Sequence, residues 1–534
     1  MKSTKIINSF LTAFIICSIS ACSYNNLQPS EVNIEYGGSN FEISTASKCH
    51  VIDGSVIVYP DGFSVRGNII HGYGVRVNFT EKNNSFSNEK KIVNRFHLDS
   101  IVAVTTYTDY TGGRDIANGT LGFLGILLSG VTVYCIACPK CCFGSCPTIY
   151  TFNNSQANLE TELFSSSISR MLEADDLDKI TQKIPDDGIY KLKITNEALE
   201  THYIDKFNLI LTEHPLGTEI YPNTVGGMTL FKKPVSIDKA TNSKGEDITD
   251  EVRNADTVYY RSGVKMTGEL REGPKFDWAE ITSVVPENAD NAKILVRYRN
   301  TLLSTVLFYD VVLGSQGIRA VDWIDKMNNN ASYASDFKMI YDNFSGMGFE
   351  INTNGVWISA GKFPDAGPIC WKYTAAEISL SGAEEIKFRL KFIPDNFMID
   401  YIGVEYGSAE DNQINIQNLT PVKINNLTGD SAINTLRILE NADKNYLITN
   451  PGDSYSFVYK ITKRNDVRQS LMISSKGYYN EWIRGSWIKA DSSVKRFNLY
   501  NVRENLILIA ESWELNKELL ESEFFKTRIS VKEK

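Results

Sequence analysis

Five cysteines stand within twelve residues of this chain, in the stretch YCIACPKCCFGSCPT at 134–148. Thiols this close together can hold a metal, exchange electrons or form disulfides, and their spacing helps to tell these roles apart. A ferredoxin-type iron–sulfur cluster needs the run C-x2-C-x2-C-x3-C-P. Cys135, Cys138 and Cys141 keep the first spacing, but four residues separate Cys141 from Cys146. The stretch therefore departs from the iron–sulfur pattern.

Two other kinds of chemistry remain for the same thiols. Structural zinc takes four thiolate or imidazole ligands, usually as two pairs separated by a loop, and here the pairs have almost no loop between them. The segment CPKC at 138–141 is a C-x-x-C motif whose lysine would lower a thiol pKa. Redox motifs of this kind begin a helix in a βαβ fold, which the surrounding sequence does not predict. We therefore expect no metal and no other cofactor.

The amino-terminal residues indicate where these thiols reside. Residues 1–21 combine two lysines, a short apolar run and small residues, which is the pattern of a secretory signal peptide. The exit Ile19-Ser20-Ala21-Cys22 resembles the bacterial lipobox, which implies that Cys22 is the lipidation site, carrying palmitate-type chains. Acyl chains contribute about 0.8 kcal/mol per buried CH2. In such lipoproteins an Asp after the cysteine favours inner-membrane retention, so Ser23 implies the outer membrane, with residues 22–30 as a tether.

An oxidising compartment favours structural disulfides. Seven cysteines remain when the signal peptide and Cys22 are set aside, so at least one thiol is left over. Cys142 and Cys146 are close enough in sequence to bridge a tight turn, and Cys135 or Cys138 would reach Cys49. Each bridge would contribute about 2–4 kcal/mol of stability.

Further motifs support the envelope location. The segments PKCCFGSCPTIY, FSSSISRML and ALETHYID resemble a family of uncharacterised bacterial envelope lipoproteins, whose signature is CFGSCPT followed by an aromatic residue. That family commonly has serine where this chain has Cys141, which implies that Cys141 is the spare thiol. The resemblance implies a location and a domain plan, and no activity is known for the family.

Length and composition argue against several classes of protein. A chain of 534 residues is too long for a single core and predicts several domains. The net charge of -9, without a basic stripe, argues against a nucleic-acid partner. The chain has five histidines and no HExxH motif, which argues against a hydrolytic zinc centre. It also lacks G-x-S-x-G and Walker motifs.

The patterns along the chain predict a mainly β fold with interspersed helices, in other words a multidomain α+β protein. We expect a small β-barrel at 31–110 and an apolar Gly-rich segment with the Cys cluster at 111–150. A part with a helix plus strands follows at 151–245, and its helix is expected over 155–180. A jelly-roll-like β-sandwich at 246–406 and a mixed β/α domain at 407–534 complete the plan.

One segment leaves the membrane topology open. Residues 116–138 carry no charged side chain and are numerous enough to span a bilayer. Four glycines within them disfavour a helix, because each costs up to about 1 kcal/mol relative to alanine. The segment either enters a membrane or is buried within the protein.

The sandwich carries the candidate ligand-binding residues. The segment IKFRLKFIPDNFMIDYIGVEYG at 386–407 resembles the last strands of galactose-binding-like jelly rolls, and NTNGVWISAGKF at 352–363 resembles a hairpin of those sandwiches, with an Asn-Gly turn. Aromatic rings with polar neighbours suit the faces of sugars. The candidates are Trp357, Trp371, Arg389 and Tyr401.

Paired carboxylates would instead indicate glycoside hydrolysis. Acidic residues are frequent throughout this chain, so such pairs arise often, and we assign no catalytic residue. The pairs considered are Asp336 with Asp342, Asp395 with Asp400, and Glu384 with Glu385.

These observations favour a non-enzymatic envelope lipoprotein that binds or scaffolds other components. Its partners would be the lipid bilayer, through acylated Cys22, and envelope proteins or glycans. Two alternatives stay open: a glycan-active hydrolase, and a membrane-integrated component of an envelope complex that uses residues 116–138.

Overall fold

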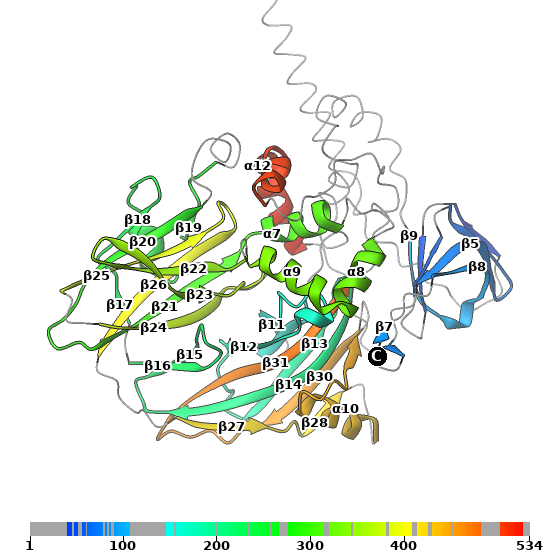
Figure 1. The fold of residues 1–534 in the computed structure, drawn as a ribbon. Helices are drawn as coiled ribbons and strands as arrows, with labels where there is room; N and C mark the ends of the chain where they lie inside the picture. Colours follow the sequence, from blue (N-terminus) through cyan, green and yellow to red (C-terminus); the bar gives the residue numbers. More distant parts are fainter. Residues whose placement is uncertain are drawn as a thin grey trace, which may run out of the picture.

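The computed structural model describes residues 40–106, 146–265, 276–481 and 502–526, with short gaps inside the first three ranges. Three β-rich units and a set of helices make up this part of the chain (Figure 1). The predicted fold class, mainly β with interspersed helices and several domains, is confirmed.

The first unit is an antiparallel sheet with the order β1-β4-β5-β3-β2-β9, in which β8 pairs with the other edge of β5. A bulge between His71 and Gly74 bends β5. No ladder joins β9 to β8 or to β1 among the described strands, so the expected small barrel is an open sheet here. Its strands are β1 (Phe41–Ile43), β2 (Ser47–Val51), β3 (Val56–Tyr59), β4 (Phe63–Arg66), β5 (Ile69–Val77), β8 (Lys90–His97) and β9 (Ile101–Thr106), beside the small hairpin of β6 (Glu81–Lys82) and β7 (Ser85–Phe86).

The second unit is the predicted β-sandwich. Its first sheet has the order β17-β26-β21-β24, with β19 on β26, and its second sheet has the order β18-β20-β25-β22-β23. Residues from both sheets form a shared apolar core, and in β20 and β25 the buried positions alternate along the strand. The strands are β17 (Val235–Ser236), β18 (Lys239–Asn242), β19 (Tyr260–Arg261), β20 (Asp277–Val284), β21 (Asn291–Asn300), β22 (Met347–Thr353), β23 (Val356–Phe363), β24 (Lys372–Ser379), β25 (Glu385–Phe392) and β26 (Phe397–Gly407), with the short helix α5 (Thr249–Val252).

The hairpin between β22 and β23 turns at Asn354 and Gly355, which have φ angles of 53° and 84°. Two consecutive positive φ angles are what a two-residue hairpin turn requires, and Asn-Gly is the sequence that accepts them most readily. The turn predicted from the sequence is therefore confirmed.

The third unit contains two sheets that draw on segments from both sides of the sandwich. One has the order β11-β10-β13-β30-β28, and the other has the order β12-β31-β14-β27, with β29 on β14. Segments 148–214 and 415–481, expected in different domains, thus share the same sheets. Their strands are β10 (Thr148–Asn153), β11 (Gln156–Glu162), β12 (Ala174–Ile180), β13 (Ile189–Thr195), β14 (Glu200–His214), β27 (Asn415–Leu419), β28 (Lys423–Asn425), β29 (Leu447–Thr449), β30 (Ser454–Lys460) and β31 (Arg468–Glu481); a hairpin of β15 (Glu219–Pro222) and β16 (Met228–Phe231) follows β14.

The helix expected over 155–180 is wrong. The structure has β11, a 3-10 turn at Arg170–Leu172 and β12 in its place. Glu160 of β11 turns inward, where it accepts hydrogen bonds from Thr151 at 2.8 Å and from the Thr181 amide at 2.8 Å. Pairing with neighbouring strands thus overrides a short apolar pattern that fits a helix as well as a strand.

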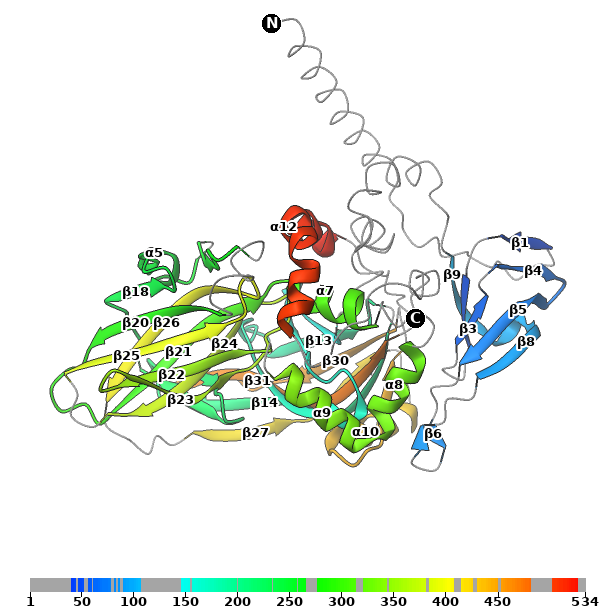
Figure 2. The same cartoon turned by 45° about the horizontal axis from the view of Figure 1, so that its top comes forward.

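The helices gather mainly beside the third unit, and those expected from the sequence near 301–330 and 502–525 are confirmed. They are α7 (Leu303–Val306), the π-helix η3 (Leu307–Leu313), α8 (Ala320–Asn329), α9 (Ala331–Tyr341), α10 (Asp430–Glu440) and α12 (Val502–Lys526). Trp513 and Phe524 of α12 are buried in the large core that these helices share with the third unit. Figure 2 shows α12 next to α7, over the region where the sandwich meets that unit.

Among the described helices, none is long and apolar enough to cross a membrane. Residues 116–138 lie outside the described residues, so the two interpretations of that segment stay predictions.

Candidate functional site

The structure separates the four predicted ligand-binding residues into two pairs. Trp371 and Tyr401 lie with the first sandwich sheet, just before β24 and in β26. Trp357 and Arg389 lie on β23 and β25 of the second sheet. The two pairs therefore belong to two different surfaces of the sandwich.

We call the first of these the aromatic–arginine surface. Every member except the buried Asp400 is partly exposed. Its residues come from β15, β21, β24, β26 and two adjoining loops: Tyr221, Tyr259, Arg297, Arg299, Trp371, Tyr373, Asp400 and Tyr401.

Strand register creates the centre of this surface. Arg297 of β21 is directly opposite Tyr373 of β24 on one side and Tyr401 of β26 on the other. Directly opposite residues lie about 4.5–5.5 Å apart and share a face of the sheet. The three side chains therefore form a row across three strands, with the cation between two rings.

Trp371 extends this row. The guanidinium carbons of Arg297 and Arg299 lie 5.1 Å and 5.2 Å from the centre of its indole ring, and the ring of Tyr259 lies 5.6 Å away. Cations at such distances from a ring face are attracted by its quadrupole. The two arginines thus hold the indole in place while part of it stays exposed.

Asp400 fixes the orientation of the central arginine. The Nη1 group of Arg297 donates a hydrogen bond to Oδ2 of Asp400, which is fully buried. Burial raises the pKa of Asp400 above its ordinary value, although Arg297 acts in the opposite direction. A guanidinium has five N–H donors, so this contact leaves Arg297 donors for the oxygens of a ligand.

Tyr401 is held close to the sheet by the absence of a side chain next to it. A Cβ atom at Gly403 would lie 2.2 Å from the Tyr401 hydroxyl oxygen. Only glycine leaves room for this tyrosine to lie along the strand.

The aromatic–arginine surface extends beyond Tyr373 towards the third unit. The rings of Tyr373 and Tyr221 are 5.2 Å apart, and Nζ of Lys179 lies 3.9 Å from the centre of the Tyr221 ring. The aromatic–arginine surface therefore continues onto the third unit.

On the second sheet, Trp357 and Arg389 belong to a cluster whose charged groups pair with one another. The guanidinium of Arg389 lies 4.3 Å from the Trp357 ring centre and 4.9 Å from that of Trp278. Glu350 accepts hydrogen bonds from Arg389 at 2.5 Å and from Lys391 at 3.1 Å. Burial opposes ionisation of Glu350, but these two cations outweigh it and lower the pKa of the carboxyl. The cluster ties the β22–β23 hairpin to the sheet.

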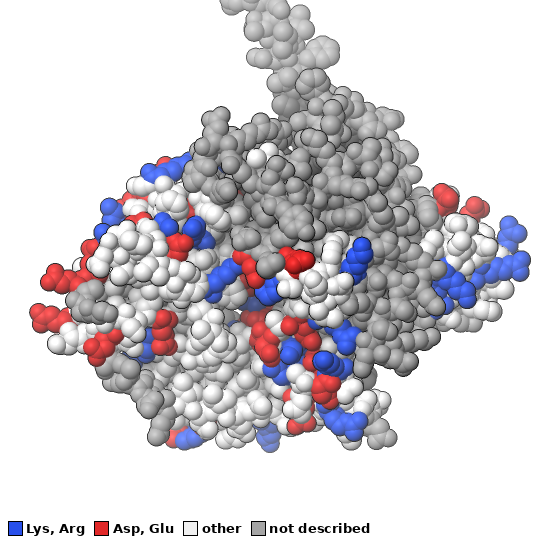
Figure 3. Space-filling view, viewed as in Figure 1, with Lys and Arg blue, Asp and Glu red and all other residues white. Residues whose placement is uncertain are grey.

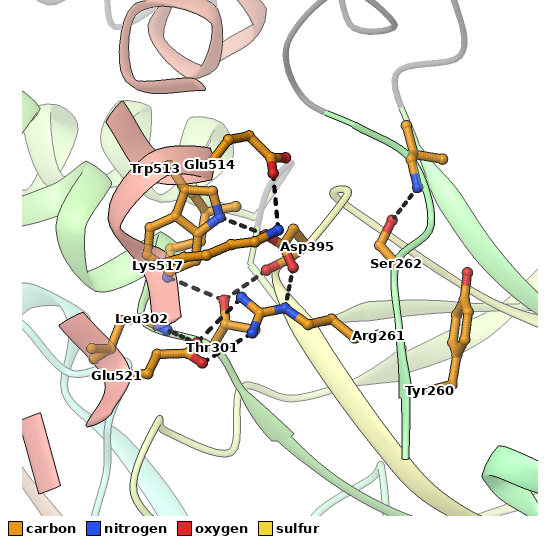
Figure 4. A network of polar contacts seen from close by, with 12 residues as sticks. Tyr260, Arg261, Ser262, Thr301, Leu302, Asp395, Trp513, Glu514, Lys517 and Glu521 are labelled. Carbon is orange, nitrogen blue, oxygen red and sulfur yellow. Dashed lines mark hydrogen bonds and ion pairs between the residues drawn. The ribbon is translucent and has the colours of Figure 1, made fainter. Parts of the chain in front are cut away.

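Four of the six carboxylates considered for hydrolysis are engaged by other groups, and Asp400 with Arg297 is one of them. Asp395 accepts hydrogen bonds from Arg261, from Trp513 Nε1 at 2.6 Å and from Lys517 Nζ at 2.9 Å, so it fastens α12 to the sandwich (Figure 4). Asp342, just after α9, is paired with Lys338 of that helix at 2.8 Å. Glu385 is paired with Lys387 at 3.2 Å. These contacts are structural.

Neither the surface charge in Figure 3 nor a group of metal ligands marks a second candidate site among the described residues. On the face shown in Figure 3, acidic and basic side chains are interspersed over the sandwich and the third unit, without a broad area of one sign. Within the described ranges, no group of three or more His, Cys, Asp or Glu residues is arranged to hold a metal ion.

Only some of the cysteines lie among the described residues, so only part of the disulfide prediction can be compared with the structure. Cys49, Cys146 and Cys370 are buried and carry no disulfide in the structure. Cys49 lies in the core of the first sheet, whereas the other two lie in the large core of the third unit. Bridges through Cys49 and Cys146 are therefore not formed here. The remaining candidates and the spare thiol lie outside the described residues, and their roles stay predictions: Cys135, Cys138, Cys141 and Cys142.

Sequence reasoning missed Arg297 and Tyr373, and it considered Asp400 only as a possible hydrolytic carboxylate and not as the partner of Arg297. A signal for the first was present in the strand KILVRYRNT, where two arginines flank an apolar tyrosine and so point to the same outer face. The strand pairing that brings Tyr373 and Tyr401 to either side of Arg297 has no local signature.

Comparisons with known proteins supply no family. No family model matches the chain, and no curated protein matches it. Similar solved structures include the C-terminal CBM6 of LamC, a laminarinase from Zobellia galactanivorans, at 9% identity over 36% of this chain and 98% of that one, with a TM-score of 0.14. An allantoicase matches at 10% identity over 43% and 80%, with a TM-score of 0.18. A GH31 alpha-xylosidase from Xanthomonas citri matches at 7% identity over 82% and 38%, with a TM-score of 0.16. Likeness at this level carries no functional argument.

Proposed function

We propose that this protein is a non-enzymatic envelope lipoprotein that binds carbohydrate on the aromatic–arginine surface. The observation that carries the proposal is the placement of Arg297 beside three partly exposed rings, with its orientation fixed by a buried carboxylate. Trp371 and Tyr373 offer ring faces to the apolar face of a sugar. The N–H donors of Arg297 suit the hydroxyl oxygens at its edge.

This combination is what small-ligand sites commonly use. Such sites consist mostly of apolar and aromatic side chains, with a few polar groups that fix orientation. On the second sheet, Glu350 already engages both Arg389 and Lys391. The first sheet therefore offers the better-suited surface, and among the four predicted residues we assign Trp371 and Tyr401 to it.

The contacts favour binding over hydrolysis. Glycoside hydrolases place two carboxyl groups about 5–9.5 Å apart on either side of the bond that breaks. However, Asp400 is fully buried and accepts a hydrogen bond from Arg297. Its carboxyl group is thus out of reach of a glycosidic oxygen.

Replacing Trp371 with alanine is expected to weaken carbohydrate binding at least tenfold, which corresponds to about 1.4 kcal/mol, because the main stacking platform is lost. The measurement is affinity electrophoresis of the full chain in gels that contain a soluble β-glucan, xylan, galactan or polygalacturonate. The matched control is Trp357→Ala, which removes an indole from the opposite sheet and should leave the retardation unchanged. A wild-type chain that no polysaccharide retards would contradict the proposal, as would a chain that only Trp357→Ala affects.

A further inference from the structure

A lysine beside the aromatic–arginine surface is directed away from it. Lys372 stands between Trp371 and Tyr373 in sequence, and 13% of its side chain is exposed. Its Nζ group lies 2.6 Å from Oδ1 of Asp178 and 3.5 Å from Oδ2 of Asp176, both on β12. The strand that presents Tyr373 is therefore fastened to the third unit by its first residue.

The third unit also contacts the residues just before Lys372. Glu162 of β11 accepts a hydrogen bond from the amide of Ile369 at 2.9 Å, and its backbone oxygen accepts one from Lys372 at 2.9 Å. Gly367 has a φ of 81°, and a Cβ atom there would lie 2.6 Å from a Glu162 carboxylate oxygen. Glycine thus allows the loop to close over the carboxylate. Glu162 therefore contacts both ends of the loop at residues 367–372, which includes Trp371.

We propose that Glu162, Asp176, Asp178 and Lys372 form an anchor through which the third unit positions the sugar-binding rings, and that this anchor makes sugar binding weaker as the pH rises. The inference rests on the proposed function. Glu162 and Asp178 are positioning residues, since they act on Trp371 and Tyr373 through the chain between them and not through the ligand.

The charges of the anchor give the sign of this pH dependence. The groups that interact with Asp178 or lie next to its partners are Asp176, Glu160, Glu162, Lys372 and Cys370. Burial opposes the charge of Lys372, but the two aspartates keep the pKa of the ammonium above its ordinary value. Burial, together with Asp176, raises the pKa of Asp178 to about 7, although Lys372 acts against it.

The folded anchor therefore binds a proton that the unfolded chain would release near pH 3.8. The stabilisation is complete below that value and is lost as the pH rises towards 7. Above pH 7, Asp178 adds a second negative charge that one lysine does not balance. The loop that carries Trp371 is then held less firmly, and the rings are less well positioned.

The test compares the wild type with Asp178→Asn, which mimics the protonated carboxyl at every pH. The matched control is Asp175→Asn on the same strand, because that side chain is 64% exposed and pairs with Lys206. Affinity electrophoresis in the polysaccharide that retards the wild type is run at pH 6 and pH 8.5. We expect binding by the wild type and by the control to weaken several-fold at pH 8.5, while Asp178→Asn binds equally at both values. An equal pH dependence in Asp178→Asn would overturn the inference.

A second measurement needs no ligand. Hydrogen–deuterium exchange of residues 367–373 is followed in the full chain, with the wild type and Asp178→Asn compared at the same pH. We expect several-fold faster exchange in the wild type at pH 8.5 and equal exchange at pH 6. Equal rates at both pH values overturn the anchor, whatever the sugar does. Absence of retardation in every polysaccharide overturns the proposed function, and the exchange data still decide whether the anchor exists.

Discussion

Replacing Asp395 with alanine is expected to lower the free energy of unfolding by about 3–5 kcal/mol, which is the usual cost of removing one partner from a buried ion pair. Asp395 is 1% exposed and accepts hydrogen bonds from Arg261, Trp513 and Lys517 (Figure 4). Its loss leaves two cations and an indole N–H without this acceptor at the place where α12 meets the sandwich.

The backbone of Asp395 adds to this cost. Its φ is 61°, in the left-handed region, which Asp and Asn accept more readily than alanine. Asp395→Asn keeps the shape and should therefore destabilise the protein less than Asp395→Ala. Urea denaturation followed by circular dichroism measures both changes, with exposed Glu385→Ala as the control. A change below about 1 kcal/mol for Asp395→Ala, the size expected of an exposed pair, would show that this contact does not hold the helix.

Replacing Cys22 with serine is expected to move the protein from the membrane fraction to the soluble fraction. The expectation comes from the lipobox-like residues before Cys22, because the acyl chains would supply about 0.8 kcal/mol per buried CH2. Fractionation after a high-salt wash, followed by immunoblotting, measures the distribution. Ser23→Ala keeps the cysteine and is the matched control. If the serine variant stays in the membrane pellet, the lipid is not its anchor, and the segment 116–138 becomes the candidate.

The sandwich could be predicted from the sequence because its signals are local. Strands such as β20 and β25 alternate buried and more exposed residues, and Asn354-Gly355 marks a turn that few other sequences form. The sheets of the third unit could not be predicted in this way. β14 pairs with β31 along Glu200–His214 and Arg468–Glu481, across about half of the chain. No pattern within either segment identifies the other.

In the candidate site, too, single residues have local sequence signals, whereas their arrangement depends on long-range strand pairing. Trp371 and Tyr401 each stand out in the sequence as an aromatic residue of a predicted sandwich. Their connection through Arg297 depends on the registers of β21 with β24 and with β26. Residue type alone groups Trp357 and Arg389 with them, whereas the register places both on the other sheet.

The sandwich interrupts the third unit, and this has a consequence for the order of folding. All sandwich strands are synthesised by Gly407, whereas β13 and β14 must wait for β30 and β31. Val235 of β17 pairs with Val404 of β26, so the chain enters and leaves the sandwich on neighbouring strands. A folded sandwich therefore brings the two flanking segments together and removes much of the entropy cost of closing so long a loop. We expect the sandwich to fold first and to act as the template on which the rest of the molecule assembles.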